Sequence, residues 1–104
     1  MIGFDYFPNE TSWNVTESNK DLFVASSPSY YSDLAHNTTT QQLCLNEGKY
    51  VFSIHDGMGH GLCCFEGFGY YCVTSHSNII AKGGVFEFHE SMSFEIPFVY
   101  RRQF

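Results

Sequence analysis

Three acidic residues stand where their carboxylates could bind a cation. Asp5 and Glu10 lie in the first turn of the chain, and Asp56 opens a loop, residues 56–61, in which every second residue is glycine. Calcium takes six to eight oxygens from carboxylates, backbone carbonyls and water, and a glycine loop can turn its carbonyls inward. If the two loops share one end of the fold, Asp5, Glu10 and Asp56 form a calcium site. The alternative is that these acids cap turns by accepting hydrogen bonds from backbone N–H groups.

Four cysteines are the second chemically informative group: Cys44, Cys63, Cys64 and Cys72. Their spacing contains no C-x-x-C, which disfavours a structural zinc site and favours two disulfides. Because adjacent cysteines do not easily bond each other, we expect Cys44 to pair with Cys63 or Cys64, and Cys72 to take the other. Each bridge would add about 2–4 kcal/mol to the stability of a small core.

Three N-x-[ST] sequons, at Asn9, Asn14 and Asn37, are acceptors for N-linked glycans. Together with an even number of cysteines they predict a secreted or cell-surface protein. Residues 1–20 contain no apolar core of a signal peptide. We therefore expect the chain to be a mature fragment or one module of a longer precursor.

Other chemistry is less well supported by the residues. His55 and His60 could suggest a transition metal, but no third ligand is recognisable, and exposed histidines are the simpler interpretation. No G-x-S-x-G elbow presents a nucleophile, so no catalytic residue is predicted. A pair of glycosidase carboxylates is the one enzymatic alternative that the sequence leaves open.

Composition favours a β-structure without nucleic-acid or membrane-spanning functions. The 104 residues are 43% hydrophobic and 18% aromatic but only 15% charged, a bias typical of strands, and they suffice for one domain over residues 1–104. A net charge of -6 leaves no basic patch for phosphates. No apolar run approaches the ~20 residues that span a bilayer.

Alternating patterns predict many short strands and essentially no helix. Tyr50, Phe52 and Ile54 alternate with polar or smaller residues, and Trp13 alternates with Asn14, which should face solvent. Turn signals recur every 8–12 residues, which indicates an antiparallel sandwich. The expected strands are 2–7, 13–16, 21–25, 39–45, 50–55, 70–74, 78–81, 85–89 and 93–100.

The C-terminal segment, residues 93–104, alternates apolar residues with others and contains Pro97, which places a strand at a sheet edge. Either this strand closes its own sandwich or it crosses into a neighbouring copy. The residues that would mediate assembly are Phe94, Ile96, Phe98 and Tyr100.

A joint pattern of motifs runs along the chain. It is close to D-x-x-P-x-E-T-S-W, then C-L, G-x-Y-x-F-x-I-x-D-x-x-G-D-G-x-C-C, G-x-G-x-Y and a late G-G-x-F. Matching pieces run from Asp5 to about Phe94, and include Pro8, Glu10-Thr11-Ser12-Trp13, Cys44-Leu45, Gly48, Tyr50, Phe52, Ile54, Asp56, Gly59, Gly61, Cys63-Cys64, Gly67, Gly69-Tyr70 and Gly83-Gly84-Val85-Phe86. In these motifs the chain resembles a secreted β-sandwich module of extracellular proteins from microbial eukaryotes and bacteria.

The resemblance implies a jelly-roll-like sandwich with an adhesive, structural or accessory role and no catalysis. Two positions depart from the pattern. Lys49 stands where the family often has a cysteine, which makes Cys72 the replacement partner, and His60 stands in place of the second acid of the loop, which weakens a cation site there.

Aromatic residues exceed what one small core easily buries, and we expect these at the surface: Tyr30, Tyr31, Phe65, Phe68, Tyr70, Tyr71, Phe98 and Tyr100. The low charge and the alternating tail favour a subunit interface. The sequence therefore predicts a non-catalytic, glycosylated extracellular module that assembles with copies of itself into a fibre or surface layer by strand addition. The alternative is a carbohydrate-binding or adhesion module, with or without calcium.

Overall fold

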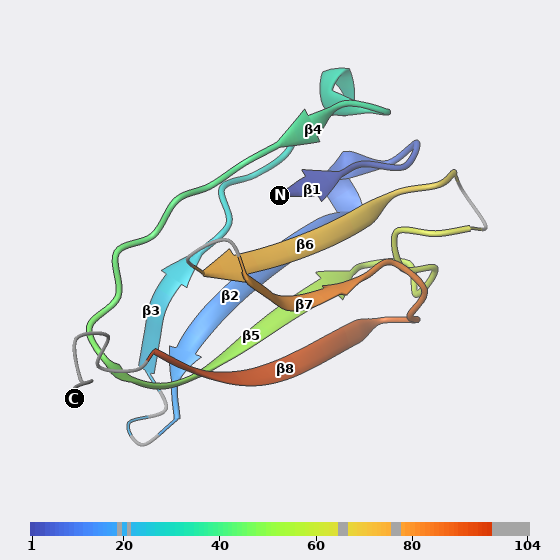
Figure 1. Cartoon of the computed structure of the whole chain (residues 1–104). Helices are drawn as coiled ribbons and strands as arrows, with labels where there is room; N and C mark the ends of the chain where they lie inside the picture. Colours follow the sequence, from blue (N-terminus) through green and yellow to red (C-terminus); the bar gives the residue numbers. More distant parts are fainter. Residues whose placement is uncertain (19, 21, 65–66, 76–77, 97–104) are drawn as a thin grey trace.

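Eight strands form two four-stranded antiparallel sheets in the computed structural model, which describes residues 1–18, 20, 22–64, 67–75 and 78–96 (Figure 1). This confirms the predicted all-β sandwich. The first sheet has the order β4-β1-β6-β7 and the second the order β3-β2-β5-β8. The strands are β1 (Ile2–Gly3), β2 (Thr11–Glu17), β3 (Leu22–Ser26), β4 (Thr38–Thr39), β5 (Gly48–Asp56), β6 (Tyr70–Ser75), β7 (Asn78–Gly83) and β8 (His89–Ile96).

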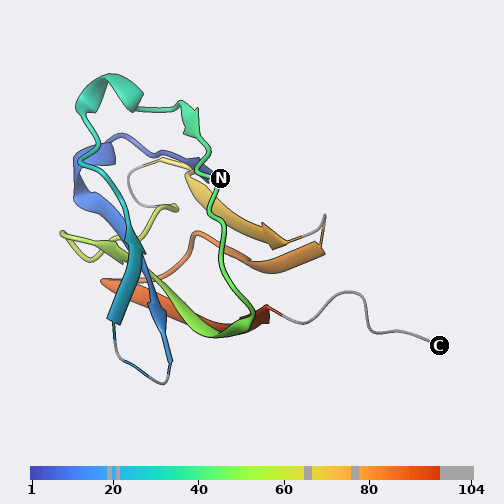
Figure 2. The ribbon, with the colours of Figure 1, turned by 90° about the vertical axis from the view of Figure 1, so that its left-hand side faces the viewer.

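Helix is confined, within the described residues, to two single 3-10 turns, η1 (Pro8–Glu10) and η2 (Ser32–Leu34). No described helix has the length and apolar character needed to cross a membrane. Figure 2, viewed from the side, shows β6 and β7 of one sheet lying above β5 and β8 of the other.

The alternating pattern of the central strands decides which faces meet. Tyr50, Phe52 and Ile54 are buried along β5, as predicted. On the neighbouring β2, Trp13 lies opposite Ile54 and Val15 lies opposite Phe52, so the buried residues of the two strands share one face. A slip of one residue would turn this whole set outward, and the period-2 pattern therefore fixes the register.

The core contains one buried polar link that the sequence did not reveal. The indole Nε1 of Trp13 donates a hydrogen bond to the hydroxyl of Tyr30 at 2.8 Å. Tyr30 is buried, which corrects the prediction that it is a surface aromatic; its neighbour Tyr31 is exposed as predicted. Burial raises the pKa of Tyr30, and the hydrogen bond with Trp13 partly offsets this effect.

A second polar link joins the two sheets. The hydroxyl of Tyr71 on β6 donates a short hydrogen bond to the carboxylate of Glu90 on β8. Burial raises the pKa of Tyr71 above its usual range, and the hydrogen bond and negative charge of Glu90 raise it further, so the phenol stays protonated as a donor. Tyr71 is thus a second predicted surface aromatic that is buried.

Three predicted strands are shorter than expected or missing. The strand predicted over 2–7 ends at Gly3, because Oδ1 of Asp5 accepts a hydrogen bond from the backbone N–H of Phe7 and turns the chain. The strand predicted over 39–45 ends at Thr39, since the chain then leaves the first sheet for β5 in the second (Figure 1). The strand predicted over 85–89 is reduced to an isolated bridge between Val85 and Cys63.

The predicted terminal strand begins four residues earlier than expected, at His89, and its described part is β8. Within the described residues β8 pairs with β5 alone, at the edge of its sheet, as predicted. Phe94 stacks on Tyr50 with the ring centroids 5.6 Å apart, and Ile96 also packs against the core. These two assembly candidates therefore belong to the protein's own sandwich, whereas Phe98 and Tyr100 lie outside the described residues.

Candidate functional site

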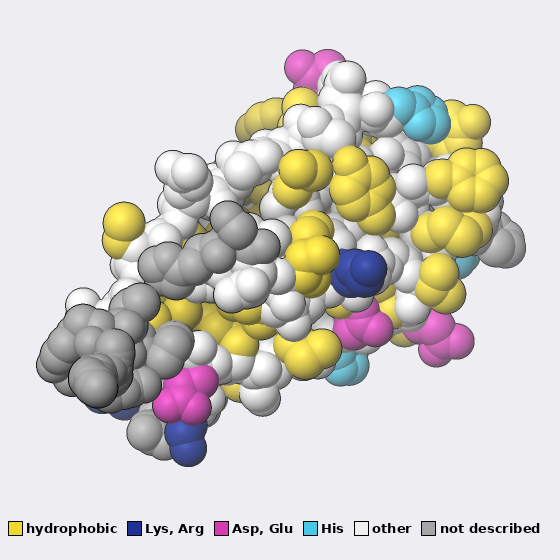
Figure 3. All heavy atoms as spheres, in the orientation of Figure 1, with side chains coloured by type: hydrophobic (Ala, Val, Ile, Leu, Met, Phe, Trp, Pro, Cys, Tyr) yellow, Lys and Arg dark blue, Asp and Glu magenta, His cyan; other side chains and the backbone are white. Residues whose placement is uncertain are grey.

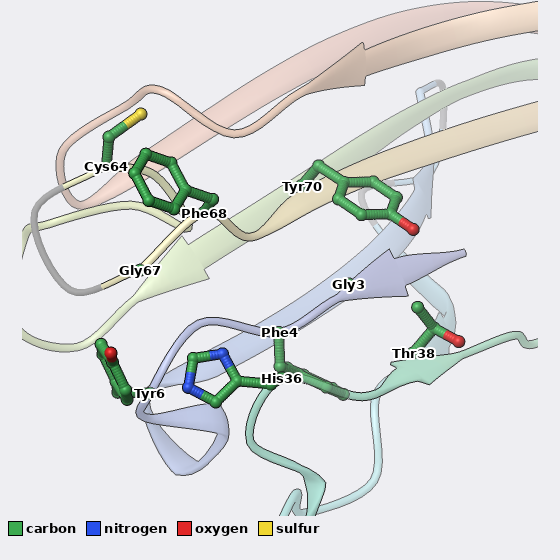
Figure 4. A pocket seen from close by; sticks show the side chains of 9 residues that line it. All are labelled: Gly3, Phe4, Tyr6, His36, Thr38, Cys64, Gly67, Phe68 and Tyr70. Atoms are coloured by element: carbon green, nitrogen blue, oxygen red, sulfur yellow. The ribbon is translucent and has the colours of Figure 1, made fainter.

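A pocket of about 520 Å³ opens on the first sheet between β1, β6 and two loops (Figure 4). Phe4 and Gly3 form its base, and the side chains of Tyr6, His36, Phe68 and Tyr70 stand around it. The remaining lining residues are Thr38, Cys64 and Gly67. The volume is within the range of pockets that hold small ligands.

Close backbone contacts shape this pocket. The ring of Tyr70 lies directly over Gly3, where any Cβ would overlap it. His36 adopts a left-handed backbone conformation with φ of 63° and donates its backbone N–H to the carbonyl of Asp5. Its ring then meets the ring of Tyr6 edge to face, with the centroids 4.4 Å apart. The first turn and the loop before β4 are thereby held together at the pocket wall.

Exposed rings give the pocket its chemical character. Tyr6, Phe68 and Tyr70 expose 57%, 83% and 43% of their surface. Figure 3 shows hydrophobic side chains gathered at the right-hand end of the molecule beside a histidine. Exposed aromatic rings offer flat apolar faces on which sugar rings can stack, and the phenol and imidazole groups can hydrogen-bond hydroxyls. Phe68 and Tyr70 were predicted as surface aromatics, whereas Tyr6 and His36 carried no sequence signal of this role.

Two of the three acids of the predicted calcium site, Asp5 and Asp56, make turn-capping hydrogen bonds. Asp5 and Asp56 are 1% and 2% exposed, and each carboxylate accepts a backbone hydrogen bond, from Phe7 and His60 respectively. Glu10 lies beside Asp56, because its carbonyl accepts the backbone N–H of Gly57. Both aspartates therefore make the turn-capping hydrogen bonds that the sequence left as the alternative to calcium.

No three His, Cys, Asp or Glu side chains are grouped as metal ligands in the described part of the chain. Two oxygens near the predicted set, Oδ1 of Asp56 and the hydroxyl of its cross-strand neighbour Thr11, are buried without a hydrogen-bond partner among those residues. Calcium binding at Asp5, Glu10 and Asp56 remains a prediction.

The two histidines considered as metal ligands, His55 and His60, take different positions. His55 faces outward on β5 opposite His89 of β8, with the ring centroids 6.0 Å apart, and Nε2 lies 3.4 Å from the amide nitrogen of Asn14. Burial lowers the pKa of His55, and the nearby charge of His89 lowers it further. His60 lies in the glycine loop, where its backbone N–H binds Asp56.

The disulfide pairing differs from the prediction. Cys63 is bonded to its neighbour Cys64, with the Cα atoms 3.0 Å apart, and Cys44 and Cys72 are free. The predicted partners lie in separate places. Cys63 belongs to the loop after β5, beside Phe68, whereas Cys44 and Cys72 line the space between the two sheets.

Two of the three sequon asparagines, Asn9 in η1 and Asn37 before β4, are exposed. Asn14 lies on the outward face of the central strand β2 and is half-buried, so it is less accessible than the alternating pattern predicts. The strands β3 and β5 flank it on both sides and account for this difference.

Comparison of the chain with protein-family models, with curated proteins and with solved structures gives no match. The resemblance to secreted β-sandwich modules therefore rests on the shared residues alone.

Proposed function

We propose that this protein is a non-catalytic extracellular structural module that assembles with copies of itself into a glycosylated fibre or surface layer by strand addition. The observation that carries the proposal is the edge position of β8, an eight-residue strand whose only partner among the described residues is β5. The other long side of such a strand presents unpaired backbone N–H and C=O groups, which are a template for a strand of another chain.

Three further observations support this function. The chain repeatedly passes from one sheet to the other, as expected of the jelly-roll-like modules that the sequence resembles. Two exposed sequon asparagines could carry glycans without disturbing either sheet. The vicinal Cys63–Cys64 disulfide agrees with an oxidising environment, although Cys44 and Cys72 are free.

A charge introduced on the free edge should block assembly. We expect Ser93→Lys, at an exposed position of β8, to remove oligomers that the wild-type protein forms at high concentration, because edge lysines oppose strand pairing. Sedimentation velocity and electron microscopy of the secreted, glycosylated protein measure this. Ser12→Lys makes the same change at an exposed position of the central strand β2 and should assemble normally. A wild-type protein that stays monomeric at every concentration contradicts the proposed function.

The aromatic pocket supports a second candidate, a carbohydrate-binding or adhesion module. We expect a glycan array to give hits for the wild-type protein that are lost in Phe68→Ala, because Phe68 is the most exposed ring of the pocket. Val85→Ala removes a similarly exposed apolar side chain outside the pocket and should keep every hit. An array without hits removes this candidate and leaves the assembly proposal standing.

A further inference from the structure

An apolar groove of about 740 Å³ lies between the two sheets, at the end where β6 and β8 finish. Sheet residues from both sides line it: Trp13, Phe52 and Phe94 from one sheet, and Tyr71, Val73 and Ile80 from the other. The edge strands β7 and β8 therefore both contribute to its walls. Figure 3 shows hydrophobic side chains in the region between β6 and β8. These six residues belong to the hydrophobic core or pack against it. The groove therefore exposes core surface that an additional strand could cover.

We propose that this groove receives residues 97–104 of a neighbouring copy, which add beside β8 as a donor strand. The inference rests on the proposed function and names the donor and acceptor of the assembly. The donor sequence, PFVYRRQF, offers Phe98, Val99 and Tyr100 to an apolar groove. Its backbone supplies main-chain hydrogen bonds to an open edge, and its alternate side chains fill pockets, as in other cases of strand addition.

The position of the donor favours a neighbour over the chain's own groove. Ile96 is the last described residue of β8 and already lines the groove. Pro97 follows directly, and the residue before a proline is biased away from the helical region toward extended conformations, which is compatible with the chain continuing beyond Ile96. Eight extended residues span about 26 Å, which is about half of the 49 Å long axis of a neighbouring molecule.

Charge also favours this docking. Both arginines of the protein, Arg101 and Arg102, lie in the donor, which has no acidic residue. All eleven acidic residues lie in residues 1–96, together with only three lysines. A donor of positive charge is thus attracted to a body of negative charge. Because the donor and the acceptor are different surfaces, the contact is head to tail and extends into a filament instead of closing as a dimer.

The test uses the secreted, glycosylated chain with residues 97–104 deleted, and a synthetic PFVYRRQF peptide. We expect the truncated protein to remain folded by circular dichroism, to stay monomeric where the full chain assembles, and to bind the peptide. In the truncated protein, Ile80→Asn should weaken peptide binding at least about tenfold. Ile79→Asn is the matched control on the same strand, 58% exposed and outside the groove, and should bind the peptide like the parent.

Peptide variants make the test independent of folding. A peptide in which serine replaces Phe98 and Tyr100 should not bind the truncated protein. If the wild-type peptide does not bind either, the groove is not the acceptor. Assembly of the truncated protein overturns the donor but leaves the proposed function intact. A full chain that is monomeric, and that melts at a lower temperature after truncation, shows that the segment fills its own groove and overturns the exchange between copies.

Discussion

Replacing Gly61 with alanine should destabilise the protein by about 2–5 kcal/mol. Gly61 has φ of 64°, a left-handed conformation that costs an L-residue about 1–2 kcal/mol. A Cβ there would overlap the carbonyl of Phe86 and lie 2.9 Å from the carbonyl of Gly84. The carbonyl of Gly84 accepts hydrogen bonds from Leu62 and Cys63, so it cannot move aside without breaking them. The steric overlap of the new Cβ with these carbonyls accounts for the rest of the expected loss of stability.

The control for this variant lies in the same loop. Gly57 has no positive φ, and the nearest atom to a Cβ there is the carbonyl oxygen of Glu10 at 3.8 Å, an ordinary contact. We expect Gly57→Ala to stabilise the protein by about 0.4–1 kcal/mol, because alanine lowers the conformational entropy of the unfolded chain, or to leave stability unchanged. Urea unfolding of both variants measures the difference. If both variants changed the free energy of unfolding equally, a Cβ at position 61 would not clash with residues 84–86.

Truncation of Ile54 to alanine should cost about 2–5 kcal/mol, a large part of the total stability of a domain of this size. Ile54 is 0% exposed at the centre of β5 and lies between Trp13 on β2 and Glu90 on β8. The lost methyl groups leave a cavity that the neighbouring rings cannot fill without leaving their own contacts. Thermal and urea unfolding should show the loss directly.

Ile79→Ala removes the same atoms from an exposed position on β7 and should change stability by no more than about 0.5 kcal/mol. The comparison separates burial from the preference of isoleucine for strands, since both residues lie in strands. If the two variants were equally destabilised, Ile54 would not belong to the core between the sheets.

Much of the sandwich follows from short patterns in the sequence. The alternation of β2 and β5 is local and strong, and it correctly predicts which of their residues are buried. The strands that were shortened or lost have ends that depend on contacts distant in sequence. The bridge between Val85 and Cys63 and the turn capped by Asp5 are examples.

The candidate site was less predictable than the fold. Phe68 and Tyr70 are recognisable as excess aromatics, but Tyr6 and His36 become neighbours only because the first turn and the loop before β4 meet at β1. Leu62 is fully buried although it lies within a loop that has no apolar period. The link between Trp13 and Tyr30 likewise joins residues whose sequence separation gives no indication of contact.

Local sequence patterns alone predict that this protein is built of strands, which faces of β2 and β5 are buried, and that the strand over residues 93–100 lies at a sheet edge. These properties follow from residue type and period 2, which act over a few neighbours along the chain. The bond between Cys63 and Cys64, the particular turn-capping hydrogen bonds of Asp5 and Asp56, and the open pocket and groove become visible only in the folded chain. Those features depend on which distant segments come into contact, and no local pattern encodes that.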